Sequence, residues 1–152
     1  MAGDHQFSAL AGTWRGGGRG EYPTIAGFTY SEELVVMPVP DRPLAHGRST
    51  TRDAESGEPR HAESGFLRSV GDGVELVVAH GFGIVETAAG TFDGAVLDLT
   101  STGLLGTASA KRVDGVERRY QLDGDALSYT IAMAAVGVPL THHLAASLAR
   151  DG

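Results

Sequence analysis

Residues 12–25 read Gly-Thr-Trp-Arg-Gly-Gly-Gly-Arg-Gly-Glu-Tyr-Pro-Thr-Ile, and this stretch says more about the fold than any other part of the chain. Glycine recurs at alternate positions from Gly16 to Gly20, two residues after the only tryptophan, Trp14. A strand this rich in glycine is typical of places where backbone approaches a ligand closely or bends sharply at a barrel corner. A flexible glycine loop is the alternative, because composition alone does not separate the two.

The glycine run does not fit a nucleotide-binding loop. A dinucleotide fingerprint opens a helix, whereas this run ends in Tyr22-Pro23-Thr24, and Pro23 favours extended or turn backbone before it. A phosphate loop of the Walker type needs Gly-Lys followed by Ser or Thr. The one lysine of the chain, Lys111, stands in no such motif, so this interpretation is excluded.

Length and composition favour one domain over residues 1–152. The chain has no cysteine, which excludes disulfides and thiolate metal sites, and it has neither a long apolar run nor a signal-peptide pattern at its start. These features predict a cytoplasmic protein without membrane association. The net charge of −7 argues against nucleic acid as a partner, because nucleic-acid binding needs a basic surface.

Alternation of apolar and polar residues and four Asp-Gly pairs predict many short strands joined by hairpins. The Asp-Gly pairs begin at Asp72, Asp93, Asp114 and Asp123. Strands are expected near residues 12–20, 28–37, 44–52, 60–69, 74–80, 83–88, 95–101, 106–113, 116–122 and 126–135. Residues 140–150 fit either a helix or a final strand. The predicted fold is all-β, a single closed antiparallel up-and-down barrel of about ten strands, with a short N-terminal helix over residues 5–11.

The histidines and acidic residues give few local motifs. His61-Ala62-Glu63 resembles the His-x-Glu of zinc deaminases, but those enzymes also need cysteines, which this chain lacks. A zinc site of His61, His80 and His143 is a weaker hypothesis, because these residues lack local ligand spacing. Glu32 and Glu33 are adjacent on a predicted strand, so they point to opposite faces and cannot serve one site together.

The pair His142-His143 is the strongest candidate for chemistry. If this segment is a strand, one histidine points into the barrel and the other points out. His142 shares its parity with Leu140, Leu144 and Leu148, so alternation alone favours His142 as the inward residue.

Taken together, the motifs resemble the nitrobindin family of heme-binding β-barrels over about residues 10–150. The resemblance rests on the following residues: Gly12, Trp14, Gly16, Gly18, Gly20 and Tyr22-Pro23-Thr24-Ile25; Phe28, Tyr30 and Glu32-Glu33; Pro59, His61, Glu63, Gly65-Phe66 and Arg68; Gly83 and Val85-Glu86; Met133-Ala134; and Thr141-His142-His143-Leu144. Fatty-acid-binding proteins share the barrel and a Gly-x-Trp start, but not Tyr-Pro-Thr-Ile or the terminal His-Leu.

This resemblance implies a ten-stranded barrel that binds heme b, stable in the ferric state. It implies that His143, in the terminal His-Leu, is the axial ligand of the iron and that Thr24 contacts the heme. His61, His80 and Met133 match positions that line the pocket. The family binds nitric oxide and isomerises peroxynitrite to nitrate, so nitric oxide and peroxynitrite are the expected small ligands.

The resemblance and the alternation disagree over which histidine faces the pocket. If the leucines pack outward, then Thr141, His143, Ala145 and Ser147 line the pocket, and small residues beside the histidine leave room for a porphyrin. We therefore predict His143 as the ligand and His142 as a flanking residue.

Two other functions stay open at this point. One is a heme-based nitric oxide carrier or sensor without turnover, and the other is a lipocalin-like binder of a different apolar molecule. The negative net charge does not attract peroxynitrite, so steering of this anion would fall to a local arginine such as Arg60. The sequence leaves the oligomeric state open, with a homodimer as one alternative.

Overall fold

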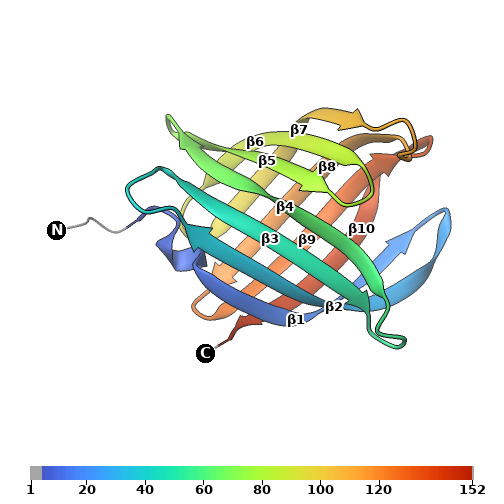
Figure 1. Cartoon of the computed structure of the whole chain (residues 1–152), viewed down its shortest axis with the longest axis horizontal. Coiled ribbons are helices and arrows are strands. Elements are labelled where there is room, and N and C mark those ends of the chain that lie inside the picture. Colours follow the sequence, from blue (N-terminus) through green and yellow to red (C-terminus); the bar gives the residue numbers. More distant parts are fainter. Residues whose placement is uncertain (1–4, 152) are drawn as a thin grey trace.

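The computed structural model describes residues 5–151, which form a closed antiparallel β-barrel (Figure 1). Each strand pairs with the next, and β1 pairs with β10 to close the barrel, so no long edge is left unpaired. The strands are β1 (Gly12–Tyr22), β2 (Ile25–Pro38), β3 (Leu44–Asp53), β4 (Pro59–Val70), β5 (Gly73–His80), β6 (Ile84–Phe92), β7 (Val96–Gly106), β8 (Val113–Asp123), β9 (Ala126–Ala135) and β10 (Val138–Arg150). Among the described residues, no helix is long and apolar enough to cross a bilayer.

The structure confirms the all-β barrel of ten strands and corrects several local expectations. The expected N-terminal helix is a single 3-10 turn, η1 (Ser8–Leu10). Residues 140–150 form part of strand β10 rather than a helix. The strand expected over residues 106–113 is wrong, because residues 107–112 form the β7–β8 loop and β7 ends at Gly106.

The pair Asp114-Gly115 is also not the hairpin that its sequence predicted. It lies inside β8, where the register with β9 shifts between Val113 and Gly115. Such a shift marks a β-bulge, which uses the same turn-prone residues as a hairpin without reversing the chain. The β7–β8 reversal is made instead by the preceding loop, whose sequence carries no Asp-Gly signal.

One end of the barrel is closed by an apolar core. Trp14 is fully buried, and its indole N–H donates to the carbonyl of Leu10 in the 3-10 turn at 2.9 Å. Phe7 packs beside them, and its ring stacks on Phe92. Trp14 therefore packs near one end of the barrel. In Figure 1 the 3-10 turn and the C-terminal end of β10 lie at this same end.

Two of the alternating glycines of β1 make room for aromatic rings of β2. A Cβ at Gly18 would lie 2.5 Å from the ring of Tyr30, and a Cβ at Gly20 would lie 2.1 Å from the ring of Phe28. No side chain fits at these distances without moving an aromatic ring of β2. Residues 12–22 form a strand, so the flexible-loop alternative is wrong.

The opposite end of the barrel is open and carries exposed apolar side chains. The hairpins β1–β2, β3–β4, β5–β6, β7–β8 and β9–β10 lie around this end (Figure 1). Large apolar residues on or next to these hairpins are strongly exposed: Ile25, Phe82, Leu105, Val136 and Leu140. Apolar groups gathered around an opening are typical of a site that takes an apolar ligand.

Candidate functional site

His143 lies at the open end of the barrel and is held in one orientation by β1. Its Nδ1 is 3.0 Å from the carbonyl oxygen of Glu21, which can only accept, so Nδ1 carries the proton and Nε2 carries the lone pair. The ring of Tyr22 meets the His143 ring edge-on, with centroids 5.3 Å apart. Among the described residues, no hydrogen bond is found for Nε2 of His143. Burial lowers the pKa of His143, which favours the neutral imidazole that metal binding needs.

Tyr22 is itself fixed by two hydrogen bonds to β9. Its hydroxyl donates to the carbonyl of Met133 at 3.0 Å and accepts the N–H of Ala135 at 3.0 Å. Tyr22 is buried, so these hydrogen bonds hold the phenol in place. The sequence motif Tyr-Pro-Thr therefore contains a residue that positions His143, a role that the sequence reasoning missed. Its neighbour in the motif, Thr24, is exposed in the β1–β2 turn next to this segment.

A β-bulge in β10 explains why alternation failed at the histidine pair. The register between β10 and β9 shifts between His142 and Leu144, so one extra residue interrupts the alternation. His142 is exposed, whereas His143 is partly buried against β1. Beyond the bulge, Leu144 packs against the core and Leu148 is buried in it.

The same bulge corrects the expected lining of the pocket. Ser147 is exposed, on the outer face of the barrel with Ala145, so neither lines the interior. The prediction of an inward row of small residues on β10 is wrong beyond the bulge, because parity restarts there. The preference for His143 over His142 does not depend on that row, since His143 is the partly buried histidine of the pair and packs against Tyr22.

His61 and His80 lie together on the wall formed by β4 and β5. Nδ1 of His80 is 3.1 Å from Nε2 of His61, and both rings contact the ring of Phe82 with centroids 5.2 Å apart. Strand β5 is separated from β10 by four strands on either side of the barrel, so this wall faces the wall of His143. Two of the three histidines of the hypothetical zinc site, His61 and His80, therefore lie together. Their third neighbour is Glu63 and not His143.

A buried polar network continues from these histidines into the middle of the barrel. Arg118 on β8 donates to Glu63 at 3.1 and 3.2 Å and to Glu86 at 2.9 Å. Glu86 also accepts from Nε2 of His80 at 2.8 Å, and it is completely buried. Among the described residues, every buried side-chain nitrogen and oxygen has a hydrogen-bond partner. Arg118, Tyr120 and Leu122 are spaced two residues apart on β8 and so share one face of the strand. This spacing is the sequence signal that Arg118 is buried.

The charges in this network set the protonation of its carboxyl groups. Burial alone would raise the pKa of Glu63, but the charge of Arg118 and hydrogen bonds from His61 and Arg118 outweigh it and hold this pKa well below its usual range. The pKa of Glu86 is also lowered, since bonds from His80 and Arg118 outweigh its burial. Glu32 differs, because burial outweighs the hydrogen bonds from Ser49 and Tyr129 and raises its pKa. As expected, Glu33 points away from Glu32 and pairs with Arg15.

Glu32 belongs to a separate set of hydroxyl groups deeper in the barrel. Ser49 donates to Glu32 at 2.6 Å, Tyr129 donates to its other oxygen, and Tyr30 meets the hydroxyl of Tyr129 at 2.7 Å. Burial raises the pKa of Tyr30 to about 12. These phenols therefore stay protonated and act as structural hydrogen-bond donors.

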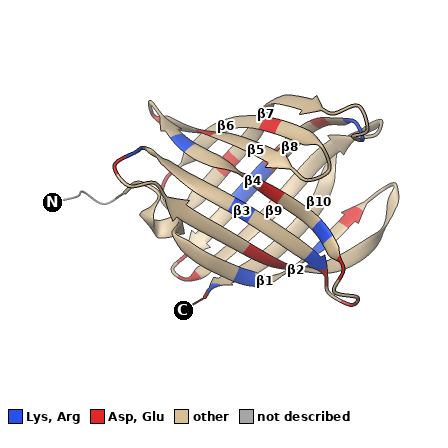
Figure 2. Cartoon of the chain, in the orientation of Figure 1, with Lys and Arg blue, Asp and Glu red and all other residues tan. Residues whose placement is uncertain are grey.

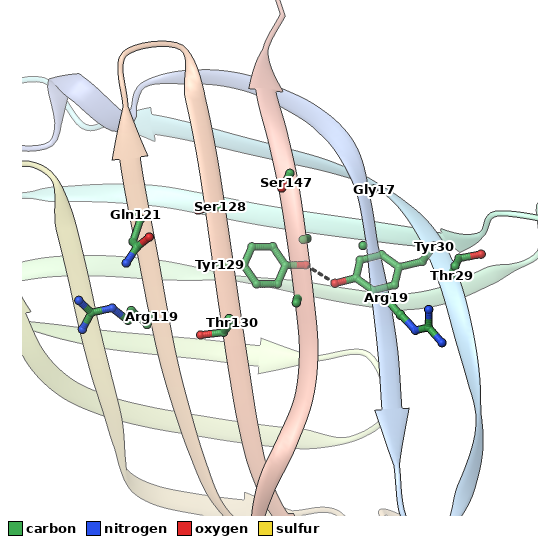
Figure 3. A pocket seen from close by; sticks show the side chains of 13 residues that line it. Gly17, Arg19, Thr29, Tyr30, Arg119, Gln121, Ser128, Tyr129, Thr130 and Ser147 are labelled. Atoms are coloured by element: carbon green, nitrogen blue, oxygen red, sulfur yellow. Dashed lines mark hydrogen bonds between the residues drawn. The ribbon is translucent and has the colours of Figure 1, made fainter.

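A groove of about 740 Å³ lies on the outer face of the barrel and is distinct from the His143 site (Figure 3). Its outward residues are small or polar, including Gly17, Ser128, Thr130 and Ser147, while the Tyr30 and Tyr129 rings lie behind the strands. It contains no histidine. Charged residues of both signs are interspersed along the strands (Figure 2), so the ribbon shows no broad region of one charge.

The barrel, its open apolar end and the oriented histidine define a small-ligand-binding β-barrel. The family model described as "THAP4-like, heme-binding beta-barrel domain" matches residues 5–150, so the chain belongs to this family of heme-binding barrels. This finding confirms the resemblance inferred from the motifs.

Individual relatives agree with this membership. The chain is 46% identical over 150 residues to a protein of Nocardia farcinica named peroxynitrite isomerase, covering 95% of this chain and 89% of the relative. It is 45% identical over 153 residues to peroxynitrite isomerase 1 of Mycobacterium tuberculosis, covering 95% and 93%. The crystal structure of Rv2717c from M. tuberculosis superposes with a TM-score of 0.89 at 42% identity, covering 96% of this chain and 95% of that one. An S-type phycobiliprotein lyase from Guillardia theta, 12% identical with a TM-score of 0.68, shares the fold alone.

Proposed function

We propose that this chain binds heme b through Nε2 of His143 at the open end of the barrel, and that the loaded protein isomerises peroxynitrite to nitrate. Membership in a heme-binding barrel family supports the cofactor. The names of the relatives from Nocardia farcinica and Mycobacterium tuberculosis support the reaction.

The orientation of His143 is the observation that carries this proposal. The Glu21 carbonyl fixes the proton on Nδ1, and the lowered pKa keeps the ring neutral, so Nε2 presents a lone pair. A ligating histidine in a metal site donates its second N–H to a carbonyl or carboxylate in the same way. An imidazole held like this is a suitable axial ligand for heme iron.

The remaining residues of the open end would enclose the heme and would not act as acids or bases. Ile25 and Phe82 provide apolar surface that a porphyrin would cover. Heme iron supplies the reaction chemistry when bound, so the protein's part is to bind, orient and limit access of water. Arg60 lies 3.9 Å from the Phe28 ring centroid and pairs with Asp53 at 2.7 Å, so its charge is largely compensated at this rim.

Hemin titration of His143→Ala and His142→Ala tests the ligand. The two histidines are adjacent, and His142 is exposed, which makes it the matched control. We expect His143→Ala to lose the absorbance spectrum of histidine-ligated heme and His142→Ala to keep it, with both variants folded by circular dichroism. A normal spectrum in His143→Ala would overturn the assignment, and the reverse pattern would show that the ligand is His142.

Peroxynitrite decay and nitrate yield test the reaction. Ferric heme-loaded protein should accelerate decay and raise the nitrate yield relative to the heme-free chain. If heme binds but the two forms behave alike, the heme-carrier interpretation replaces the enzyme. If hemin produces no Soret band, the lipocalin-like interpretation replaces both.

The pocket residues are part of the same proposal. We place Thr24 at the heme edge and His61, His80 and Met133 around the cavity, supported by the motif match and by the position of the β1–β2 turn at the open end. Thr24→Val should raise the hemin dissociation rate and leave the thermal midpoint of unfolding unchanged. An unchanged dissociation rate would remove Thr24 from the site.

We further propose nitric oxide as a small ligand of the loaded protein, because histidine-ligated heme binds diatomic ligands. A spectral titration with nitric oxide tests this.

The net charge of −7 supports the absence of nucleic acid and anionic membrane surfaces among its partners. Cell fractionation tests the predicted cytoplasmic location, and light scattering tests a homodimer against a monomer.

A further inference from the structure

Three side chains on the β4–β5 wall converge on one point. The atoms are Nε2 of His61, Nδ1 of His80 and Oε2 of Glu63. Their separations are 3.1 Å between the two nitrogens, 3.2 Å from His80 to Glu63 and 3.4 Å from His61 to Glu63. We propose that these three residues form a binding site for a divalent transition metal ion such as Zn²⁺, separate from the site of His143.

The triangle has the dimensions of one face of a tetrahedral metal site. Zn²⁺ binds histidine nitrogen and carboxylate oxygen at about 2.0–2.2 Å. In a tetrahedron with such bonds, neighbouring ligand atoms lie about 3.3–3.5 Å apart. The three ligand atoms are therefore already close to the required spacing. Two histidines, one glutamate and one further position are a ligand set that zinc uses.

The hydrogen bonds of the His80 ring give a second, independent reason for a metal site. Oε1 of Glu86 lies 2.8 Å from Nε2 of His80, so in the neutral ring Nε2 carries the proton and Nδ1 is an acceptor. This acceptor faces a second acceptor, the Glu63 carboxylate, at 3.2 Å. One proton on Nε2 of His61 then has to serve both atoms. A cation placed at that point would satisfy all three lone pairs directly.

The surrounding residues orient the ligands as metal sites require. Glu86 fixes the tautomer and plane of His80, which is the carboxylate–histidine–metal arrangement found in zinc sites. Arg118 holds Glu63 through two hydrogen bonds and Glu86 through two more. The cluster contains two carboxylates and one guanidinium, so with neutral histidines it has an excess negative charge for a cation to balance.

An entry path exists at the open end of the barrel. The side chain of His61 is 29% exposed, whereas that of His80 is 8% exposed. Phe82, in the β5–β6 turn, packs against both rings and is itself 48% exposed. A metal ion can therefore reach the cluster from the mouth of the barrel, with His61 as the outermost ligand and solvent available for the fourth position.

The test uses the full chain in its heme-free and heme-loaded forms. Zn²⁺ is titrated by calorimetry, and Co²⁺ is titrated while the visible absorption bands of tetrahedral cobalt are recorded. We expect one ion per chain in the heme-free form. His80→Gln and Glu63→Gln should each weaken binding by more than about 100-fold, since loss of an outer partner alone costs 10–100-fold.

His46→Gln is the matched control, because His46 sits near the outer face and bonds Ser64 at 2.9 Å outside the cluster. His61→Gln is the second ligand variant, since its more exposed ring makes it the least disruptive to folding. Absence of saturable Zn²⁺ binding, unchanged affinity in both His61→Gln and His80→Gln, or equal loss in His46→Gln would overturn the site. Binding that is lost in His143→Ala and kept in His80→Gln would also overturn it, by moving the metal to the opposite wall.

Discussion

Replacing Arg118 by methionine should be among the most destabilising single changes in the barrel. Methionine keeps the length of the aliphatic stem and removes the charge, so Glu63 and Glu86 lose their shared cation. Arg118 is 5% exposed and Glu86 is fully buried, so water cannot replace the lost partner. Breaking a buried pair in this way costs about 3–5 kcal/mol. For a domain of this size the thermal midpoint should fall by roughly 6–20 °C.

Urea unfolding followed through the fluorescence of Trp14 measures this loss, because the only tryptophan is completely buried. A chelator keeps metal ions out of the comparison. The double variant Arg118→Met/Glu86→Gln should recover part of the stability, since it removes the orphaned buried charge. Coupling of at least about 1 kcal/mol between the two changes is expected for groups in one network. Additive effects would refute the shared-cation argument.

The pH dependence gives a further check on the same variant. In the wild type the folded-state pKa values of Glu63 and Glu86 are lowered, so their stabilising effect is present above the unfolded pKa and is lost as pH falls. Without the charge of Arg118 both pKa values rise, and the penalty shrinks once the carboxyls are protonated. The stability difference between wild type and Arg118→Met should therefore be largest near neutral pH and shrink below about pH 4.5. A constant difference would contradict this account.

Three more outcomes follow from the barrel interior. Tyr22→Phe should lower stability by about 1–3 kcal/mol, because two backbone groups lose their hydrogen bonds to the phenol, and it should speed hemin loss. Tyr30→Phe is the control, because Tyr30 is a buried phenol away from His143. It should lower stability without changing the rate of hemin loss. Equal hemin loss in both would contradict the positioning role. Gly16→Ala should destabilise the protein by more than about 1 kcal/mol, since the new Cβ would lie 2.1 Å from the Ser147 carbonyl oxygen. A melting curve like that of the wild type would contradict this, because it would show that β10 moves to admit the Cβ. Because burial raises the pKa of Tyr30 to about 12, the free energy of unfolding should fall as pH rises above about 10. It should fall less in Tyr30→Phe, and urea unfolding at alkaline pH measures the difference.

Local patterns in the sequence predict most of the barrel because strand alternation and hairpin signals act over a few residues. The inward row of β9, with Leu127 and Tyr129, follows directly from alternation. The same logic fails at bulges. Asp114-Gly115 and the His142–Leu144 segment each add a residue to one strand, and nothing in a period-two pattern records where that happens. The disagreement between alternation and family motif over His143 was the one sequence-level sign of the second bulge.

The polar interior was harder to predict because its members come from strands far apart in the chain. Glu63 and Arg118 are 55 residues apart, and Glu86 comes from a third strand. Each looks like an ordinary charged residue on a strand until the barrel closes. Closure also places β5 across from β10, so histidines lie on two facing walls of the barrel.

These two walls differ in what their histidines can do. The Nδ1 of His143 bonds the Glu21 carbonyl, and within residues 5–151 its Nε2 has no hydrogen-bond partner, so it can ligate a group that enters from the mouth. Both nitrogens of His80 are engaged by other side chains, so its ring is held by the barrel itself. A substitution on the β4–β5 wall therefore acts on stability and on metal binding together. A substitution of His143 should leave the fold intact and change only what the open end can hold, which allows the two sites to be tested independently in one protein.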